Sequence, residues 1–248
     1  MNKNVDILGI NVSGLNTEGA ADAIENMIEE GGFHSVFTPN SEIIMAAYKN
    51  PEFAKLLGKA SLLTADGIGV VYASRILGDP IAERASGYDI SLKLLERGAE
   101  KGYTFYLLGA APGVAAAAKS KIEEKFTGIK ITGVHDGYFD DKEEINIIND
   151  INEKAPDVIF VCLGSPKQEK WINEAAEKIN VKVAMGLGGC LDVYAGNVKR
   201  APDIFIKFGL EWLYRLIKEP SRFFRMLALP KFMFTVIGVK LKSAGGRK

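Results

Sequence analysis

A single acidic residue, Asp66, stands in the stretch LLTADGIGVVYASR (residues 62–75) between two apolar runs, with Gly67 directly after it. No second acid lies nearby to share a proton or a metal ion, so this carboxylate has the surroundings of a lone general base. The plainer interpretation is structural, because an Asp at the start of a helical pattern often caps the helix. An Asn keeps the capping oxygen but is no base, so Asp66→Asn distinguishes the two interpretations.

Further polar residues gather in loops that each follow an apolar run. Asn40 and Gln168 can both donate and accept hydrogen bonds, which suits sugar hydroxyl and acetamido groups. Arg84 could pair with a phosphate or with Asp66. Turn chemistry explains part of the pattern, but six such loops together favour one shared polar site. The loops are TPN (38–40), TADG (64–67), GAAPG (109–113), HDGYF (135–139), GSPKQE (164–169) and GLGGCLD (186–192).

Several common chemistries lack their sequence motifs. GLGGCL (186–191) has Leu191 where a dinucleotide fingerprint needs its third glycine, and neither a GxxxxGK[ST] phosphate loop nor a GxSxG elbow is present. His34 and His135 have no partners at metal-ligand spacing, and there is no D-x-D motif. We therefore expect no metal ion, and an oxidoreductase is the weakest alternative. Phosphate binding would fall to helix N-termini, for which GAAPG and GSPKQE are suited.

The elements that position these loops are short apolar runs separated by helical patterns. Strands that are almost continuously hydrophobic predict a largely parallel sheet covered by helices on both faces. We therefore expect a Rossmann-like α/β fold for residues 1–195, with ligands bound at the C-terminal strand ends. The expected strands are VDILGINV (5–12), HSVFT (34–38), ASLLT (60–64), YTFYLLG (103–109), IKITGV (129–134), DVIFVCLG (157–164) and VKVAMGLG (181–188).

The chain changes character after residue 195. Residues 196–248 hold 12 Lys or Arg and three acids, a net charge of +9, against −9 for residues 1–195. Apolar residues at three- and four-residue steps predict an amphipathic helix over 203–219. Pro220 is placed to start a second helix, and Pro230 to break the chain again. We expect a basic appendage that docks on an anionic membrane surface; packing on the core and homo-oligomer contacts are the alternatives, and the oligomeric state stays open.

Three features bear on the compartment. The apolar stretch 226–239 is 14 residues long and contains Pro230 and Lys231, whereas a membrane span needs about 20 apolar residues. Cys162 and Cys190 are too few for a disulfide framework and fit buried thiols in a reducing compartment. The N-terminal stretch has no signal-peptide pattern. We expect a cytoplasmic protein, associated peripherally with the inner face of the cell membrane.

Seven segments match a known family in order and spacing. They are TPNSEI (38–43), TADGIGVVYASR (64–75), RASG (84–87), HDGYF (135–139), GSPKQEKWI (164–172), GLGGCLDVYAGNVKRAP (186–202) and LEWLYRLIKEPSRFFR (210–225). Over about residues 5–225 the chain resembles the WecG/TagA/CpsF glycosyltransferase family, and its basic tail resembles the wall teichoic acid branch. The resemblance implies transfer of N-acetylmannosamine, with inversion, from its UDP donor to the 4-hydroxyl of GlcNAc on undecaprenyl diphosphate. Nucleic acid is not among the implied partners.

The resemblance also implies roles for single residues. Asp66 would be the general base of a catalytic group that includes Thr38 and Gln168. Without a metal, helix N-termini and arginines would stabilise the negative charge of the leaving group. The tail would then complete the site in addition to anchoring the protein at the membrane. Donor-binding residues would be Asn40, Arg84, Gly109, Tyr138, Gly164, Gly188 and Asp192. Residues that bind the acceptor diphosphate would be Arg215, Arg222 and Arg225.

Two further alternatives stay open. The same fold could use UDP-N-acetylmannosaminuronate or another UDP-hexose, and Arg84 is then the candidate cation for the uronate. A membrane-docked nucleotide-binding module without catalysis would tolerate loss of Asp66 and show no turnover.

Overall fold

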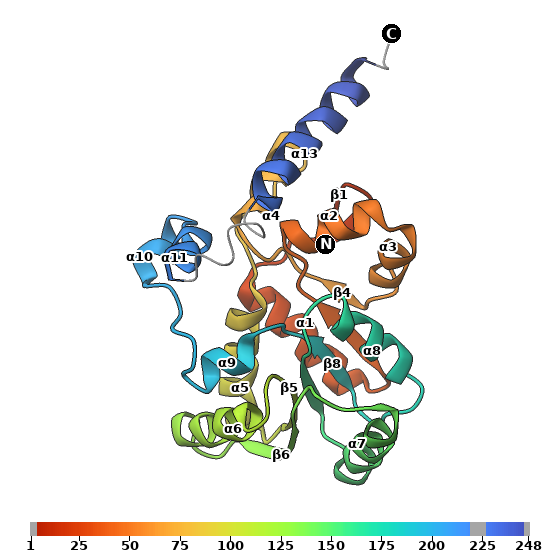
Figure 1. Cartoon of the computed structure of the whole chain (residues 1–248), viewed down its shortest axis with the longest axis vertical. Helices are drawn as coiled ribbons and strands as arrows, with labels where there is room; N and C mark the ends of the chain where they lie inside the picture. The colour runs from red at the N-terminus through yellow and green to blue at the C-terminus, as the bar shows by residue number, and fades with distance from the viewer. Residues whose placement is uncertain (1–3, 219–226, 246–248) are drawn as a thin grey trace.

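Six parallel strands form the central sheet of the computed structural model, which describes residues 4–218 and 227–245 (Figure 1). Every pairing within this sheet is parallel. The C-terminal ends of the strands therefore share one edge, where ligands of open α/β sheets bind. In spatial order the strands are β4 (Leu62–Leu63), β3 (His34–Phe37), β8 (Val183–Gly186), β7 (Val158–Cys162), β5 (Thr104–Gly109) and β6 (Lys130–His135).

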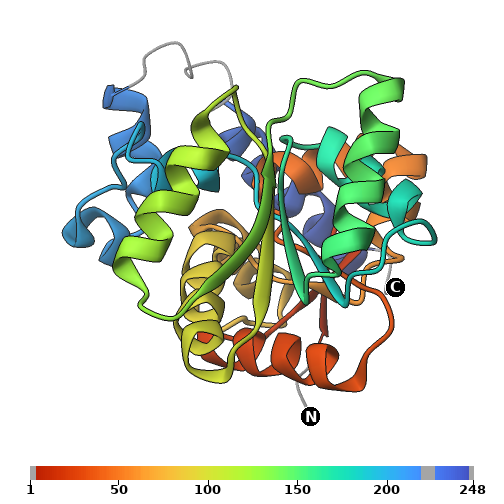
Figure 2. The same ribbon diagram turned by 90° about the horizontal axis from the view of Figure 1, so that it is seen from below.

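Helices cover both faces of the sheet, as Figure 2 shows. Along β5, Phe105 and Leu107 enter one core while Tyr106 and Leu108 enter the other. Burial on both faces explains why the strands read as continuous apolar runs, and the predicted α/β class is confirmed. The helices against the first core are α1 (Thr17–Glu30), α5 (Gly87–Lys101), α6 (Val114–Lys125) and α9 (Cys190–Tyr194). Those against the second are α2 (Ser41–Lys49), α3 (Pro51–Leu57), α4 (Ile68–Leu77), α7 (Asp141–Lys154) and α8 (Lys167–Ala175).

The first predicted strand is not part of this sheet. Residues 5–12 fold back as an antiparallel hairpin of β1 (Asn4–Ile7) and β2 (Ile10–Ser13). Leu8 and Gly9 form the turn with φ of 57° and 88°, the geometry that closes two-residue hairpins. The prediction of one parallel strand was wrong because Leu rarely adopts a positive φ, so LG gave no turn pattern.

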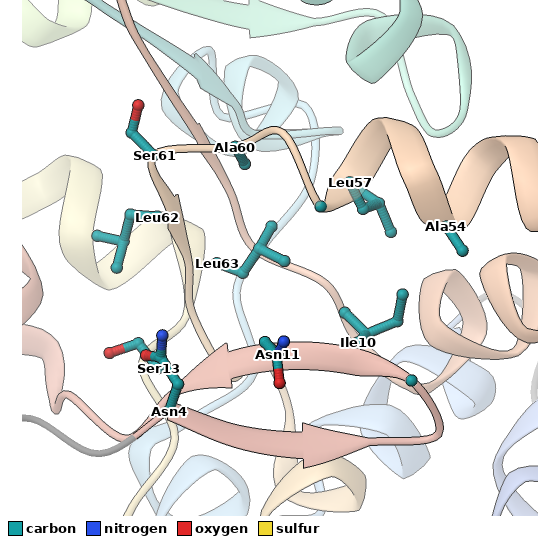
Figure 3. A pocket seen from close by; sticks show the side chains of 12 residues that line it. Asn4, Ile10, Asn11, Ser13, Ala54, Leu57, Ala60, Ser61, Leu62 and Leu63 are labelled. Carbon is teal, nitrogen blue, oxygen red and sulfur yellow. The ribbon is translucent and has the colours of Figure 1, made fainter.

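A cavity of about 260 Å³ lies between the hairpin and β4 (Figure 3). Leu57, Leu63 and Ile10 contribute apolar walls, while Asn11 and Ser13 contribute polar groups. None of the residues predicted for the site lines it. The cavity is therefore separate from the edge where the loops of interest meet.

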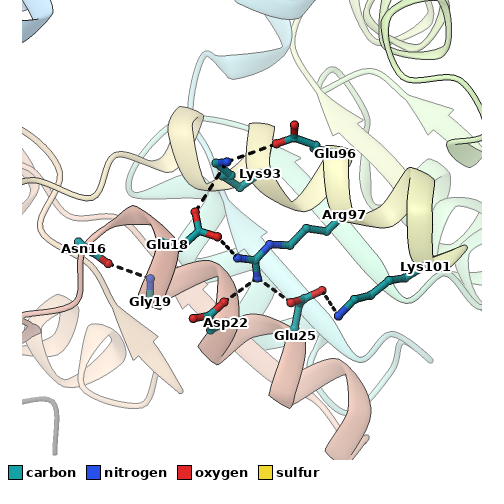
Figure 4. A network of polar contacts seen from close by, with 9 residues as sticks. All are labelled: Asn16, Glu18, Gly19, Asp22, Glu25, Lys93, Glu96, Arg97 and Lys101. Atoms are coloured by element: carbon teal, nitrogen blue, oxygen red, sulfur yellow. Dashed lines mark hydrogen bonds and ion pairs between the residues drawn. The ribbon is translucent and has the colours of Figure 1, made fainter.

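An ion-pair network joins α1 to α5 (Figure 4). Arg97 donates to Asp22 Oδ1 at 2.8 Å and to Glu25 Oε2 at 2.6 Å, and it also pairs with Glu18. Lys101 lies 2.8 Å from Glu25 Oε1. These carboxylates raise the pKa of Arg97 in spite of its partial burial. The network fixes α5, the helix whose first turn follows the RASG loop.

The C-terminal helices differ from the prediction in two respects. The helix expected over 203–219 is interrupted at Gly209, whose φ is 70°, and forms α10 (Asp203–Lys207) and α11 (Glu211–Lys218). The predicted break at Pro230 is also wrong, because α13 (Ala228–Gly245) runs through it. Pro230 lies in the first helical turn, where a missing N–H removes no intrahelical bond. The start of the second helix, predicted at Pro220, lies outside the described residues.

Helix α13 packs back on the body of the protein with one side only. Phe232 and Val236 are fully buried in the core shared with α2 and α4. Phe234 and Leu241 on its other side are 75% and 67% exposed, and the last turns project away from the body (Figure 1). None of the helices in the described part of the chain is both long enough and apolar enough to cross a membrane.

Candidate functional site

Three loops are held together by hydrogen bonds around Asp66. The Thr64 N–H donates to the Phe37 carbonyl at 3.0 Å, and the Asp66 N–H donates to the Pro39 carbonyl at 3.3 Å. The Thr64 hydroxyl also donates to the Ala85 carbonyl at 3.0 Å. The TADG, TPN and RASG loops therefore meet at the C-terminal ends of β3 and β4, as the parallel sheet predicts.

Asp66 does not cap the helix that follows it. The N-cap residue of α4 is Gly67, with φ of 90°, and no side chain caps this helix. Asp66 itself is half-buried. The capping interpretation from the sequence was therefore wrong, and the reason is local: the glycine takes the cap position with a backbone conformation that Asp seldom adopts.

Thr38 and Gln168 lie at neighbouring strand ends close to this junction. Thr38 directly follows β3 and is 8% exposed, while Gln168 is in the first turn of α8 and is 4% exposed. Gln168 Oε1 accepts from the Gly188 N–H at 2.8 Å, and its Nε2 donates to Glu169 Oε1 at 3.0 Å. Among the described residues, the Thr38 hydroxyl has no hydrogen-bond partner. The site therefore contains one oriented amide and one hydroxyl that a ligand can engage.

Two glycines make room for these side chains. A Cβ on Gly186 would lie 2.9 Å from Gln168 Nε2 and 3.0 Å from the Phe37 ring. A Cβ on Gly87 would lie 2.8 Å from Thr38 Oγ1. Glycine is needed at both positions because the backbone comes so close to its neighbours. In the sequence, both glycines are recognisable only as parts of motifs.

Arg84 faces two carboxylates. It donates to Glu211 Oε2 of α11 at 2.9 Å and lies 3.7 Å from Asp89 Oδ2. Arg200 pairs with the same Asp89 at 2.5 Å and stacks over the Tyr88 ring at 4.7 Å. This cluster was not predicted from the sequence, although Glu211 is one of only three acids in the basic tail.

The other predicted donor-binding residues fall into different local roles. Asn40 caps α2, because its Oδ1 accepts from the Glu42 and Ile43 N–H groups at 2.9 and 3.1 Å. Asp192 is half-buried in the first turn of α9, and Tyr138 is 73% exposed. Asn40 can therefore offer a ligand only its Nδ2 group without giving up the cap.

The predicted glycines also differ from one another. A Cβ on Gly109 would lie 2.4 Å from the Cys162 carbonyl oxygen, so close strand packing explains this glycine. Gly164 has φ of 76°, and its carbonyl accepts from the Gln168 N–H at 2.9 Å. Gly188 has φ of 57° and donates to the Gln168 side chain. Gly164 and Gly188 therefore hold Gln168 from two loops.

Helices α6 and α8 begin at this edge without a side-chain cap. They follow β5 and β7, which are adjacent in the sheet. By contrast, Ser86 and Asp140 cap α5 and α7. Uncapped first turns leave N–H groups available to an anion, as the sequence analysis expected for GAAPG and GSPKQE.

Two points of the C-terminal region contact the first turn of α4: Gly209, between α10 and α11, and Leu229, in the first turn of α13. A Cβ on Gly209 would lie 2.8 Å from Ile68 Cγ1, and a Cβ on Gly69 would lie 2.6 Å from Leu229 Cδ1. The chain thus leaves α10 and enters α13 beside the turn that follows Asp66. Of the predicted arginines, Arg215 belongs to α11. Its side chain, Arg222 and Arg225 lie outside the described residues.

Metal ligands do not cluster in the described ranges 4–218 and 227–245, where no group of three or more His, Cys, Asp or Glu could hold an ion. An open groove of about 430 Å³ lies nearby between α7 and α8. Its walls include Phe139, Lys167 and Trp171, and none of the predicted catalytic residues. The candidate site is therefore the junction of loops around Asp66, Thr38 and Gln168.

Comparison with known proteins identifies the family. Residues 5–245 match the model of the glycosyl transferase WecG/TagA/CpsF family. A Bacillus spizizenii (strain ATCC 23059 / NRRL B-14472 / W23) protein named N-acetylglucosaminyldiphosphoundecaprenol N-acetyl-beta-D-mannosaminyltransferase is 41% identical over 209 residues, 84% of this chain and 80% of the relative. A protein of the same name from Staphylococcus aureus (strain MRSA252) is 35% identical over 240 residues, 96% and 94% of the two chains. The chain therefore belongs to the WecG/TagA/CpsF glycosyltransferase family.

Proposed function

We propose that this protein transfers N-acetylmannosamine from UDP-N-acetylmannosamine to the 4-hydroxyl of GlcNAc carried on undecaprenyl diphosphate. The observation that carries the proposal is the match to a relative of that named activity, which is 35% identical over 96% of this chain and 94% of its own length. The product is the disaccharide that links teichoic acid to its carrier. The residues of the candidate site have the chemistry that this reaction needs.

Asp66 acts as the general base in this proposal. Conversion of an α-linked donor to a β-linked product inverts the reacting carbon, and direct inversion by a sugar hydroxyl needs one base and no second, nucleophilic carboxylate. A single half-buried Asp that is not used as a helix cap supports this role. Thr38 and Gln168 supply the neutral hydrogen bonds that orient the donor.

The diphosphate of the donor meets the first turns of α6 and α8. The two helices start after adjacent strands and lack side-chain caps, so their N–H groups and helix dipoles can stabilise the charge that develops on UDP. Gly109, Gly164 and Gly188 let the backbone approach, and Tyr138 and Asp192 stand in the loops alongside. The positive potential comes from the N–H groups in the first turns of α6 and α8.

The tail completes the site over the acceptor diphosphate. The contacts of Gly209 and Leu229 with the first turn of α4 and the Arg84–Glu211 pair support a position beside Asp66. From there Arg215, Arg222 and Arg225 bind the lipid-linked diphosphate as bidentate cations. Residues 196–248 then form a functional unit with the core of residues 1–195.

The enzyme docks peripherally on the cytoplasmic face of the cell membrane through α13. Phe234, Ile237 and Leu241 form an exposed apolar stripe, 75%, 40% and 67% exposed. The Lys231 ammonium next to Lys49 lowers the pKa of Lys49, which marks a local excess of positive charge. Anionic headgroups would relieve this repulsion while the stripe enters the interface.

The test is transfer by the full-length chain to a short-chain lipid diphosphate that carries GlcNAc, with EDTA present and with or without anionic vesicles. We expect the lipid-linked disaccharide from UDP-N-acetylmannosamine. Turnover with the uronate donor alone would overturn the donor assignment. UDP binding without turnover of either donor on vesicles would indicate a non-catalytic module. Arg84 gives little support to the uronate alternative, because its guanidinium already faces Glu211 and Asp89.

A further inference from the structure

Glu169 is a buried carboxyl group next to the proposed catalytic amide. It is 1% exposed, and burial raises its pKa. Among the described residues its Oε2 makes no hydrogen bond of good geometry, although the Ser165 hydroxyl is near enough to lower the pKa of the carboxyl in part. Burying a carboxyl whose oxygens are incompletely hydrogen-bonded destabilises the folded chain, so packing alone does not explain an acid at this position.

The hydrogen bond between Glu169 and Gln168 fixes the orientation of the Gln168 amide. The Gly188 N–H can only donate, so the Gln168 atom 2.8 Å from it is the carbonyl oxygen. The amide nitrogen is then on the other side, where Glu169 Oε1 accepts from it at 3.0 Å. Rotating the amide by half a turn would set two donors against each other at Gly188 and two oxygens against each other at Glu169. Each contact therefore excludes the flipped amide.

The space around the amide nitrogen is narrow as well. A Cβ on Gly186 would come within 2.9 Å of Gln168 Nε2, so the end of β8 limits its movement. One Nε2–H is used by Glu169, and the described residues provide no acceptor for the other. A fixed amide with one remaining donor is suited to hold a substrate oxygen.

We propose that Glu169 is a positioning residue for sugar transfer, which holds the Gln168 amide so that its second N–H faces the donor. The inference rests on the role proposed above for Gln168. Glu169 acts through that amide and does not touch the substrate. An ionised Glu169 can only accept, so it excludes the flipped amide by itself; a neutral Glu169 still accepts through its carbonyl oxygen, and the Gly188 N–H then keeps the amide in the same orientation.

The test compares four variants of the full-length chain with UDP-N-acetylmannosamine and the short-chain GlcNAc acceptor. Glu169→Gln keeps an accepting oxygen, and Glu169→Leu removes it while filling the space. Gln168→Ala removes the amide, and the Glu169→Leu/Gln168→Ala double variant completes a mutant cycle. Thermal unfolding of each variant is measured beside kcat/KM, and we expect Glu169→Leu to fold because replacing a buried acid by an apolar residue is often neutral.

We expect Glu169→Leu to lower kcat/KM about tenfold, the scale of one lost hydrogen bond, and Glu169→Gln to stay within about threefold of the parent chain. In the Gln168→Ala background Glu169→Leu should cost nothing further. An equal loss in both backgrounds, or full activity of Glu169→Leu, would overturn the inference. Full activity of Gln168→Ala would instead refute the role of Gln168, and with it the inference. Gly186→Ala is the independent check, because it displaces the Gln168 amide without changing Glu169. The decrease in kcat/KM that Gly186→Ala causes must also disappear in the Gln168→Ala background.

Discussion

Asp66→Asn separates base catalysis from folding in this protein. The substitution keeps the size of the side chain and its hydrogen-bonding oxygen, and it removes the basic carboxylate. The backbone hydrogen bond from residue 66 to the Pro39 carbonyl does not involve the side chain. Helix α4 begins with Gly67 as its N-cap residue and without a side-chain cap, so no helix cap is lost.

The expected magnitude follows from these contacts. General base catalysis contributes about 10²–10⁴-fold, which corresponds to about 2.7–5.4 kcal/mol of transition-state free energy at about 1.36 kcal/mol per tenfold. The free energy of unfolding should change by less than about 1 kcal/mol, because Asn keeps the shape of the side chain and one accepting oxygen, and neither the helix cap nor the backbone hydrogen bond is altered. Activity and stability are thus expected to separate clearly.

The assay is formation of the lipid-linked disaccharide under saturating donor and acceptor, with thermal unfolding measured on the same preparations. Asp141→Asn is the matched control, since Asp141 is an exposed acid in the first turn of α7 and should leave kcat unchanged. If Asp66→Asn keeps kcat within about threefold of the parent chain, Asp66 is not the base. If Asp66→Asn unfolds, the carboxylate is needed for folding, and its loss of activity does not identify it as the base.

Three further predictions concern stability, pH and membrane docking. Arg97→Met should lower the free energy of unfolding by about 1–2 kcal/mol in urea titrations, whereas Lys93→Met, at an exposed pair, should change it by less than about 0.5 kcal/mol; equal effects would refute the role of the partly buried Arg97–Glu25 contact. Because burial raises the pKa of Glu169 above its ordinary value of 4.5, the folded chain retains a proton that the unfolded chain releases, and stability falls as pH rises above that value. Glu169→Gln should remove this fall, so its stability relative to the parent chain should increase from pH 4.5 to neutral pH; a constant difference would contradict the shift. Phe234→Ser/Leu241→Ser should reduce sedimentation with anionic vesicles at least tenfold, since each exposed side chain contributes about 1.5–3 kcal/mol when buried, with Tyr48→Ser as the control.

The sequence was sufficient to predict the parallel sheet and the edge where the loops of the candidate site meet, because strands buried on both faces are continuously hydrophobic. It did not reveal pairings that depend on distant parts of the chain. From the sequence, Arg84 was a candidate partner of a phosphate or of Asp66. In the structure it pairs with the carboxylate of Glu211, which lies 127 positions away in the chain. Local exceptions also escaped prediction: Leu8 in a left-handed turn and Pro230 inside a first helical turn. In both cases the packing around the residue overrides its usual backbone preference, and that packing cannot be read from the local sequence.

Helix α13 limits how the function of the tail can be tested. Phe232 and Val236 are fully buried in the core, and each contributes about 1.5–3 kcal/mol on burial. Deleting residues 196–248 therefore removes about 3–6 kcal/mol from a fold whose total stability is of the order of 5–15 kcal/mol. If the truncated chain is inactive, the cause could equally be lost stability, a lost membrane contact or a lost arginine. Phe234 and Leu241 lie on the opposite, exposed side of the same helix, so substitutions there change membrane docking and leave the core packed.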